Sequence, residues 1–471
     1  MVFSSLIFLY VFLPLCLVAV WLTPSIRAQN AILLIASLFF YAWGEPIYVL
    51  LMIFTAFTIW ICGRLMHRSR AKRQKKVFLV LAIVIALSSL VYFKYTGFIV
   101  EILNTIPFVK LSVPTISLPI GISFYTFQSL TYIIDLYRGE IKIQRSFARF
   151  LLYVSLFPQL IAGPIVRYAD IEQQLLRRKI TLSGMSGGIG RFLVGLAKKV
   201  LIANYASEIV ELCLESTHFA QISSATAILG MIAFTIQIYF DFSGYSDMAI
   251  GLGAMFGFHF LENFQYPYIA RTITDFWRRW HISLSTFFRD YVYIPLGGNR
   301  HHRLRNTFIV WFLTGLWHGA SLNFVLWGLY YFILLMFERA FILPYQGKIP
   351  RVIGHIGSML AVFVGWSLFY FTSMGRLLTY WKRIFAPGLA GFLDIEAKIL
   401  WKQHLVFILL AFIFATPLLP WFKARFKRPL RQIESSPVGG FLQTAGVLFL
   451  LLLTSASLVA SSYNPFLYFR F

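Results

Sequence analysis

The sequence predicts an all-α integral membrane protein with about eleven to thirteen transmembrane or re-entrant helices. Hydrophobic residues make up 59% of its 471 residues, charged residues make up only 13%, and the mean hydropathy is +0.73. A soluble domain carries roughly 25% charged residues. A helix that crosses a bilayer needs roughly 20 apolar residues, and apolar runs suited to this role recur along the whole chain.

The candidate helices are spread along the whole chain. They are residues 3–22, 31–43, 47–62, 77–93, 117–136, 150–165, 185–212, 223–240, 245–261, 308–337, 354–372, 405–422 and 439–461. No Ser/Gly/Pro linker or long polar insertion separates them, which predicts a single membrane domain over residues 1–471. The first run has no Lys or Arg before it and Arg27 after it. It therefore lacks the basic start of a signal peptide, and we expect a retained helix with the N-terminus outside.

Basic residues are concentrated in short loops. The chain has 42 Lys and Arg against 18 Asp and Glu, a net charge of +24. By the positive-inside rule, the two main clusters face the cytoplasm beside anionic lipid headgroups. We therefore expect membrane lipids, and not nucleic acid, as the partners of this charge. The clusters are Arg64, Arg68, Arg70, Lys72, Arg73, Lys75 and Lys76, and Lys423, Arg425, Lys427, Arg428 and Arg431.

The apolar pattern is interrupted in two places. Two prolines and a glycine in Pro158-Gln-Leu-Ile-Ala-Gly-Pro-Ile-Val-Arg-Tyr168 predict a broken or kinked helix. Polar and aromatic residues break up residues 235–305. Irregular backbone at membrane depth needs protein or a water-filled cavity around it. This second region is therefore predicted to dip into the bilayer beside a solvated funnel.

His318 is the first candidate catalytic residue. It lies in the thirty-residue stretch Phe308–Phe337, which contains no Lys, Arg, Asp or Glu. An ionisable group at membrane depth is costly and marks a functional site. A neutral imidazole can remove a proton from an attacking hydroxyl, as a general base does in acyl transfer. The small neighbours Gly315, Gly319 and Ala320 either admit a substrate or let helices pack closely.

His281 is the second candidate. If Asp275 to Phe288 is helical, an apolar stripe contains Trp277, Trp280, His281, Leu284 and Phe288. Taken by itself, this position favours a buried structural histidine with hydrogen-bond partners over a functional one. Asp275 and Arg279 have the i, i+4 spacing of an ion pair.

Two carboxylates, Asp241 and Asp247, lie in an otherwise apolar run. Their separation of six residues does not place them on one face of a straight helix, which argues against a paired-carboxylate active site. Hydrogen bonds that anchor a broken helix are the expected use. The alternative is that one of them orients a catalytic histidine.

The remaining polar features exclude several classes of site. Arg289–Arg305 is predicted to be a loop that turns at Gly297-Gly298, and its charges suit either lipid headgroups or the phosphates of an acyl donor. His301-His302 has no nearby Cys and no ligand spacing, so no metal site is predicted. Cys16, Cys62 and Cys213 form no CxxC pair and predict neither a disulfide framework nor a metal site. No Walker loop, GxSxG elbow or HExxH motif occurs.

Taken together, these motifs resemble the membrane-bound O-acyltransferases, and within that family the bacterial alginate O-acetylation type. The resemblance covers nearly the whole chain, is weakest over 340–440, and has its core motifs at roughly 118–340. It rests on Phe157-Pro-Gln-Leu-Ile-Ala-Gly-Pro164, Asp241-Phe-Ser-Gly-Tyr-Ser-Asp247, Asp275-Phe-Trp-Arg-Arg-Trp-His281, Tyr293-Ile-Pro-Leu-Gly-Gly-Asn299, Leu316-Trp-His-Gly-Ala-Ser321 and Asn464-Pro-Phe-Leu-Tyr-Phe-Arg-Phe471.

The resemblance implies a ring of tilted helices around a central funnel, with His318 as catalytic histidine and His281 as the family's second histidine. His281 would orient the donor or stabilise the oxyanion. Candidates to wall the donor tunnel or contact substrate are Trp277, Trp280, Trp317, Ser321, Asn299 and Arg279.

The implied reaction uses a cytoplasmic thioester, acetyl-CoA or an acyl carrier, as co-substrate and no permanently bound cofactor. The implied partners are an extracytoplasmic acetyltransferase and a polysaccharide acceptor, for a multi-pass protein of the bacterial inner membrane. D-alanyl transfer to a teichoic-acid-type polymer is an alternative. Two further alternatives are a transporter or flippase whose histidines relay protons and a scaffold that recruits a soluble acetyltransferase.

Overall fold

The computed structural model of the chain describes residues 1–471 except 162, 217, 387–390, 427–435, 461–465 and 468–471. The described residues form helices and contain no strand. The first part of the chain comprises η1 (Phe8–Phe12), α1 (Leu13–Trp21), α2 (Ile26–Ala42), α3 (Tyr48–Arg68), α4 (Lys72–Leu103), α5 (Ile122–Arg138), α6 (Phe147–Ser155), α7 (Tyr168–Ile171) and α8 (Gln174–Arg177).

The middle of the chain alternates long and short helices. It comprises α9 (Leu182–Ala197), η2 (Lys198–Ala203), α10 (Asn204–Leu214), η3 (Phe219–Gln221), α11 (Ser224–Met255), η4 (Pro267–Ile269), α12 (Ile273–Arg279), α13 (Ile282–Phe288), η5 (Arg289–Tyr293), α14 (Arg303–His318) and α15 (Leu322–Phe337). The last part comprises η6 (Glu338–Ile342), η7 (Leu343–Tyr345), α16 (Arg351–Tyr370), α17 (Met374–Phe385), α18 (Ile395–Phe414), α19 (Leu418–Arg425) and α21 (Pro437–Ala460).

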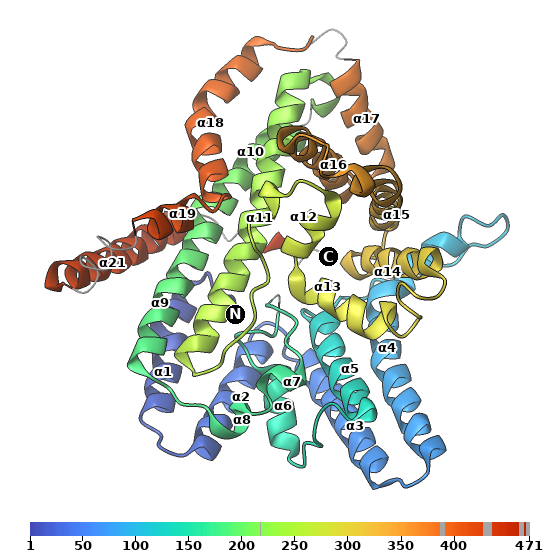
Figure 1. Cartoon of the computed structure of the whole chain (residues 1–471), viewed down its shortest axis with the longest axis vertical. Coiled ribbons are helices and arrows are strands. Elements are labelled where there is room, and N and C mark those ends of the chain that lie inside the picture. The colour runs from blue at the N-terminus through green and yellow to red at the C-terminus, as the bar shows by residue number, and fades with distance from the viewer. Residues whose placement is uncertain (162, 217, 387–390, 427–435, 461–465, 468–471) are drawn as a thin grey trace.

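The chain has the all-α integral membrane fold that its sequence predicts. Among the described residues, seven helices are long and apolar enough to cross a membrane, and two shorter apolar helices, Phe8–Trp21 and Ile26–Ala42, precede them. The seven are Tyr48–Arg68, Lys72–Leu103, Ser224–Met255, Leu322–Tyr345, Arg351–Tyr370, Ile395–Phe414 and Pro437–Ala460. Only Ser224–Met255, which is α11, is mostly buried by protein. Figure 1 shows the longer helices arranged around the short α12 and α13, with α11 passing beside them.

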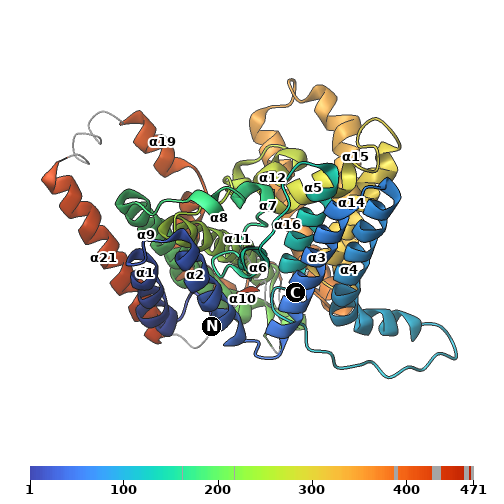
Figure 2. The same cartoon turned by 90° about the horizontal axis from the view of Figure 1, so that it is seen from below.

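The ends of the helices define two faces of the molecule. The basic cluster of residues 64–76 joins α3 to α4. The opposite end of α3 lies beside Gly44, and the backbone nitrogen of Met1 is next to Gly44. The N-terminus is therefore on the face away from this cluster. In Figure 2, α19, which carries Lys423 and Arg425, lies along the upper edge of the molecule, and the segment that follows α4 lies at the lower right.

The structure corrects two expectations for the region 235–305. Residues 223–240 and 245–261 were expected as separate segments, with Asp241 and Asp247 at a break, but α11 runs through both without interruption. Close packing explains the uninterrupted helix, because Gly244 and Gly251 of α11 lie against the backbone of α9. The irregular backbone begins only after α11 ends at Met255.

The second correction concerns Asp275 to Phe288, which is not one helix. It divides into α12 and α13, and His281 between them has left-handed backbone angles of φ 45° and ψ 56°. The carboxylate of Glu338 fixes the start of α12, because it accepts hydrogen bonds from the backbone nitrogens of Ile273 and Thr274. An acidic group at a helix N-terminus is stabilised by the unpaired N–H groups there. The histidine thus lies at a turn between two anchored helices.

The break after α6 is confirmed. This helix ends at Ser155, and the described part of residues 156–167 is not helical although most of it is buried. The segment is held by side chains from elsewhere in the fold. The backbone nitrogen of Phe157 donates to Ser37 Oγ at 3.1 Å, and that of Ile165 donates to Ser283 Oγ at 3.0 Å. Ser283 belongs to α13, so this irregular segment also braces the His281 turn.

Candidate active site

His318 is the last residue of α14, at the tip of a helical hairpin. The apolar stretch 308–337 is two helices, because the chain turns at residues 319–321 and returns as α15. Glycines allow the two helices to touch: a Cβ on Gly315 would overlap the carbonyl oxygen of Phe324, and one on Gly328 would overlap that of Trp311. Small residues have this role at membrane-helix contacts. Of the two uses that the sequence allowed for Gly315, the structure shows close packing.

The imidazole of His318 is enclosed by aromatic rings. The residue is only 4% exposed. Ring centroids of Trp317, Trp327 and Phe369 lie 5.0, 4.9 and 5.2 Å from that of His318, all edge-on. These rings come from α14, α15 and α16. Three helices therefore fix the position of this side chain and limit the access of bulk water to it.

His281 is also buried, at 1% exposure, and Asn263 is its hydrogen-bond partner. Its Nδ1 lies 3.3 Å from Asn263 Oδ1. The same oxygen accepts from the backbone nitrogen of Ser283 at 3.1 Å, and a backbone N–H can only donate, so this atom of Asn263 is the acceptor. His281 Nδ1 therefore carries its proton, and in the neutral ring Nε2 is the hydrogen-bond acceptor.

One tryptophan links the two histidines. The Trp317 ring lies 5.6 Å from the His281 ring and 5.0 Å from the His318 ring, between centroids. The two imidazoles, which are far apart in sequence, therefore both contact the ring of Trp317. The structure brings together the two histidines that the sequence singled out and one of the predicted tunnel tryptophans.

The other predicted tunnel tryptophans lie further out in the aromatic core. Trp277 packs edge-on against Trp327 at 5.4 Å, which places one ring between it and His318. Trp280 packs against Trp366 at 4.8 Å. Both tryptophans support the cluster around the histidines.

Two large cavities are lined by residues that contact or directly follow the histidines. One, of about 800 Å³, is lined by Asn263 together with polar and apolar residues of α9, α11, α19 and α21, and we call it the inner cavity. A second, of about 780 Å³, is lined by Gly319, Ala320 and Ser321 at the hairpin tip, and we call it the outer cavity. We call the face that carries residues 64–76 the basic face. The inner cavity includes Leu419 of α19, which also carries basic residues, whereas the outer cavity includes Leu118, which follows the end of α4 away from residues 64–76.

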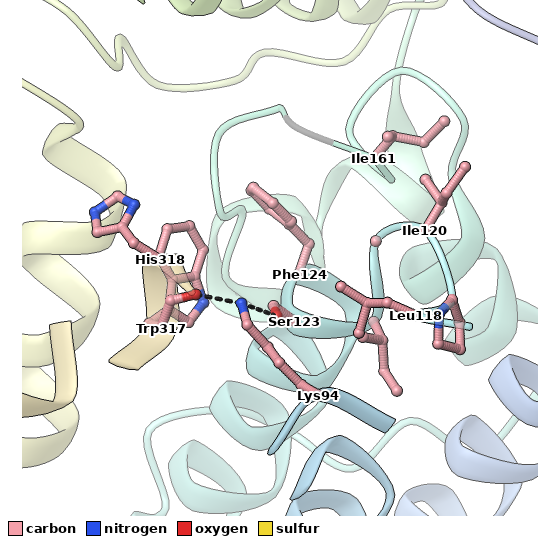
Figure 3. Close-up of a pocket in the computed structure, with 11 residues that line it drawn as sticks. Lys94, Leu118, Ile120, Ser123, Phe124, Ile161, Trp317 and His318 are labelled. Atoms are coloured by element: carbon pink, nitrogen blue, oxygen red, sulfur yellow. Dashed lines mark hydrogen bonds between the residues drawn. The ribbon is translucent and has the colours of Figure 1, made fainter. Parts of the chain in front are cut away.

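A small cavity of about 40 Å³ directly adjoins His318 (Figure 3). Lys94 of α4 lies in its wall and also lines the outer cavity. Figure 3 shows this lysine between Ser123 of α5 and the carbonyl of Trp317. Its Nζ donates to Trp317 O at 2.5 Å and to Ser123 Oγ at 3.5 Å.

Asp241 and Asp247 form ion pairs with the helix beside α11. Asp241 Oδ1 lies 2.6 Å from Lys199 Nζ, and its Oδ2 accepts from the backbone nitrogen of Leu467 at 2.9 Å. Asp247 pairs with Arg191 at 2.8 Å and Lys198 at 2.6 Å. The expectation that these carboxylates serve as structural anchors is met, although they anchor a continuous helix.

The last three predicted tunnel residues differ in their surroundings. Arg279 pairs with Asp275 at 2.8 Å, as its spacing predicted. Asn299 is exposed and accepts from Tyr293 Oη at 2.9 Å. Ser321 begins α15 and lines the outer cavity. Within the predicted C-terminal motif only Phe466 and Leu467 are described. Its last residues, Tyr468–Phe471, lie outside the described residues, as do Lys427, Arg428 and Arg431 of the second basic cluster.

Two site residues were missed in the sequence. Lys94 directly follows the apolar run 77–93. A lysine at this point of a membrane helix was a usable signal. Asn263 carried no usable signal, because its contact with His281 depends on the path of the irregular segment after α11.

The sequence model of the membrane-bound O-acyltransferase family matches residues 139–381, which include both histidines. The chain is also 39% identical to the probable alginate O-acetylase AlgI of Azotobacter vinelandii, with all of both chains covered. The chain belongs to the membrane-bound O-acyltransferase family. It is an O-acyltransferase, embedded in a membrane by several spans.

Two further relatives show the range of acceptors within the family. The chain is 29% identical to the peptidoglycan O-acetyltransferase of Helicobacter pylori, covering 100% of this chain and 98% of the relative. It is 30% identical to the teichoic acid D-alanyltransferase of Bacillus subtilis, covering 46% of this chain and 58% of the relative. These enzymes share a family but are named for different acyl groups and polymers.

Proposed function

We propose that this O-acyltransferase moves an acetyl group from a thioester on the cytoplasmic side to a hydroxyl on the other side of the membrane, for O-acetylation of a polysaccharide such as alginate. The observation that carries the proposal is the meeting of two buried histidines at Trp317, with His318 in the wall of a small cavity beside Lys94, which also lines the outer cavity. Asn263, which contacts His281, lines the inner cavity, and residues 319–321, which directly follow His318, line the outer one. The full-length likeness to an alginate O-acetylase supports acetyl as the group and alginate as the example.

His318 acts as the general base in this proposal. The acceptor hydroxyl gives its proton to the imidazole while its oxygen attacks the thioester carbonyl. The tetrahedral intermediate then collapses, the carbon–sulfur bond breaks, and the leaving thiolate takes the proton from the imidazolium. An ester and a free thiol result. The enclosing rings of Trp317, Trp327 and Phe369 keep water from competing with the acceptor.

His281 orients the donor. Because Asn263 fixes the proton on Nδ1, the neutral ring offers Nε2 as an acceptor and not as a donor. An acceptor at this point suits an amide N–H of a pantetheine arm, which both acetyl-CoA and acyl carriers possess. This tautomer therefore favours donor orientation over stabilisation of an oxyanion, the other role that the resemblance allowed.

The proposal includes co-substrates and partners but no permanently bound cofactor. Acetyl-CoA or an acyl carrier delivers the thioester from the cytoplasm. An extracytoplasmic acetyltransferase takes the acetyl group onward to the polysaccharide. The basic face that carries residues 64–76 would face the cytoplasm of a bacterium, with the protein in the inner membrane. D-alanyl transfer remains the alternative acyl chemistry, favoured by the likeness to a teichoic acid D-alanyltransferase.

Purified protein in liposomes tests the proposal and separates it from transport and recruitment. Vesicles carrying protein of known orientation are given acetyl-labelled acetyl-CoA on the basic face and a polyol acceptor on the other face. We expect labelled ester on the acceptor and a free thiol on the donor side, without any other protein. Label that crosses still attached to its carrier would support a transporter. A strict need for an added acetyltransferase, with no thiol released before it is added, would support a scaffold.

A further inference from the structure

The end of α14 lacks the usual means of satisfying its last carbonyl groups. The final four C=O groups of a helix have no partner within the helix. Many helices solve this with a glycine in left-handed conformation just after the last turn. Gly319 follows His318 but is extended, with φ −172° and ψ 155°. The carbonyls that immediately precede the catalytic histidine therefore need donors from another element.

Two neighbouring residues of α4 supply these donors. Lys94 Nζ donates to the carbonyl of Trp317 at 2.5 Å, and Tyr95 Oη donates to that of Leu316 at 2.8 Å. Both carbonyls belong to the last turn of α14, one and two residues before His318. A helix from a distant part of the sequence thus caps the end of this one.

The charge of Lys94 suits this position. Among the described residues, its polar contacts are Trp317 O and the Ser123 hydroxyl, and no carboxylate lies within ion-pair distance. The C-terminal end of a helix carries partial negative charge, which attracts a cation. The ammonium also lies 5.9 Å from the Trp317 ring centroid, over its electron-rich face. The helix end is therefore the main electrostatic partner of this half-buried lysine.

We propose that Lys94 and Tyr95 are positioning residues that cap α14 from outside the helix and hold His318 between the small cavity and the aromatic cluster. The inference rests on the proposed function, because it assumes that His318 is the general base. Positioning within a fraction of an ångström matters to a base, since misplacement of about 1 Å can slow a reaction by roughly a hundredfold.

The variants K94M, K94R and Y95F test the caps in proteoliposomes. Removal of the cationic cap in K94M should lower kcat by roughly tenfold to a hundredfold. The decrease in kcat should be smaller in Y95F, and KM for acetyl-CoA should be unchanged in both variants. K94R keeps a cationic donor and should recover most of kcat. Two control variants, K110M and T96V, change an exposed loop lysine and an exposed hydroxyl that bonds only within α4, and both should behave as wild type.

Hydrogen exchange gives a second readout that does not depend on activity. Peptides over residues 312–320 should exchange faster in K94M and Y95F than in wild type, with other helices unchanged. The proposal is overturned if K94M keeps wild-type kcat and exchange, if its defect is confined to KM, or if K94R is as slow as K94M. If the wild type transfers no acetyl group, the proposed function fails, and the exchange measurement alone still decides whether these residues hold the helix end.

Discussion

Removing Lys199 should strongly destabilise the fold. Its Nζ lies 2.6 Å from Asp241 Oδ1, and the two side chains are only 2% and 3% exposed. In K199M, the buried carboxylate keeps only the backbone nitrogen of Leu467 as a partner among the described residues. Leaving one buried charge without its counterion costs about 3–5 kcal/mol. Since each 1.4 kcal/mol is a factor of ten, the unfolded fraction should rise by a factor of roughly a hundred to several thousand.

The adjacent lysine provides a matched control. Lys198 also pairs with a carboxylate at 2.6 Å, but its side chain and that of Asp247 are 24% and 16% exposed. Asp247 also keeps Arg191 at 2.8 Å when this lysine is lost. The variant K198M should therefore lose only about 0–1 kcal/mol, as partly solvated pairs do.

Unfolding in mixed micelles, with increasing SDS and followed by tryptophan fluorescence, gives both free energies. The double variant K199M/D241L separates the charge from the packing, because it removes both ions together. It should recover at least about 2 kcal/mol of the free energy of unfolding that is lost in K199M. The recovery is reduced by about 1 kcal/mol because this variant also loses the hydrogen bond to the backbone of Leu467. The reasoning is refuted if K199M unfolds like K198M, or if the double variant is no more stable than K199M.

Two further predictions concern the active-site region. N263L removes the oxygen that accepts from His281 Nδ1 and from the Ser283 backbone nitrogen, and should lower kcat by roughly tenfold to a hundredfold while destabilising the fold by about 1–3 kcal/mol; an unchanged kcat would contradict the role given to this asparagine. G328A should destabilise the α14–α15 hairpin, because the new Cβ would overlap the carbonyl oxygen of Trp311. The control G187A, where a Cβ meets nothing within 4 Å, should be neutral or gain up to about 1 kcal/mol; equal Tm values for both alanine variants would contradict the packing argument.

The fold class could be predicted because membrane burial dictates composition over long stretches. Apolar runs such as the one within α4 have no other stable use. Local geometry could not be predicted in the same way. The turn at His281 depends on Glu338, which anchors the start of α12 from more than sixty residues away, and on Asn263. A continuous apolar stripe was present in the sequence, but distant contacts broke the helix that it suggested.

The residues of the candidate site also divide into those that the sequence revealed and those that only the structure revealed. His318 was found because an ionisable residue in an apolar stretch is costly wherever the stretch folds. Its neighbours Trp327 and Phe369 were not found, since aromatic residues are common in this chain and their meeting depends on how α15 and α16 pack. Asn299 was predicted at the site on motif resemblance, and the structure places it on an exposed loop, where its contact with Tyr293 orders that loop.

The most direct test of the account is acetyl transfer by H318A and H318Q, compared with wild type and with H67A, which removes an exposed histidine at the end of α3. All four proteins are reconstituted after their unfolding curves have been matched. Loss of a general base should slow transfer by roughly 10²–10⁴-fold in both His318 variants, and not in the control. Transfer at the wild-type rate by folded H318A would contradict the central claim that this imidazole performs the chemistry.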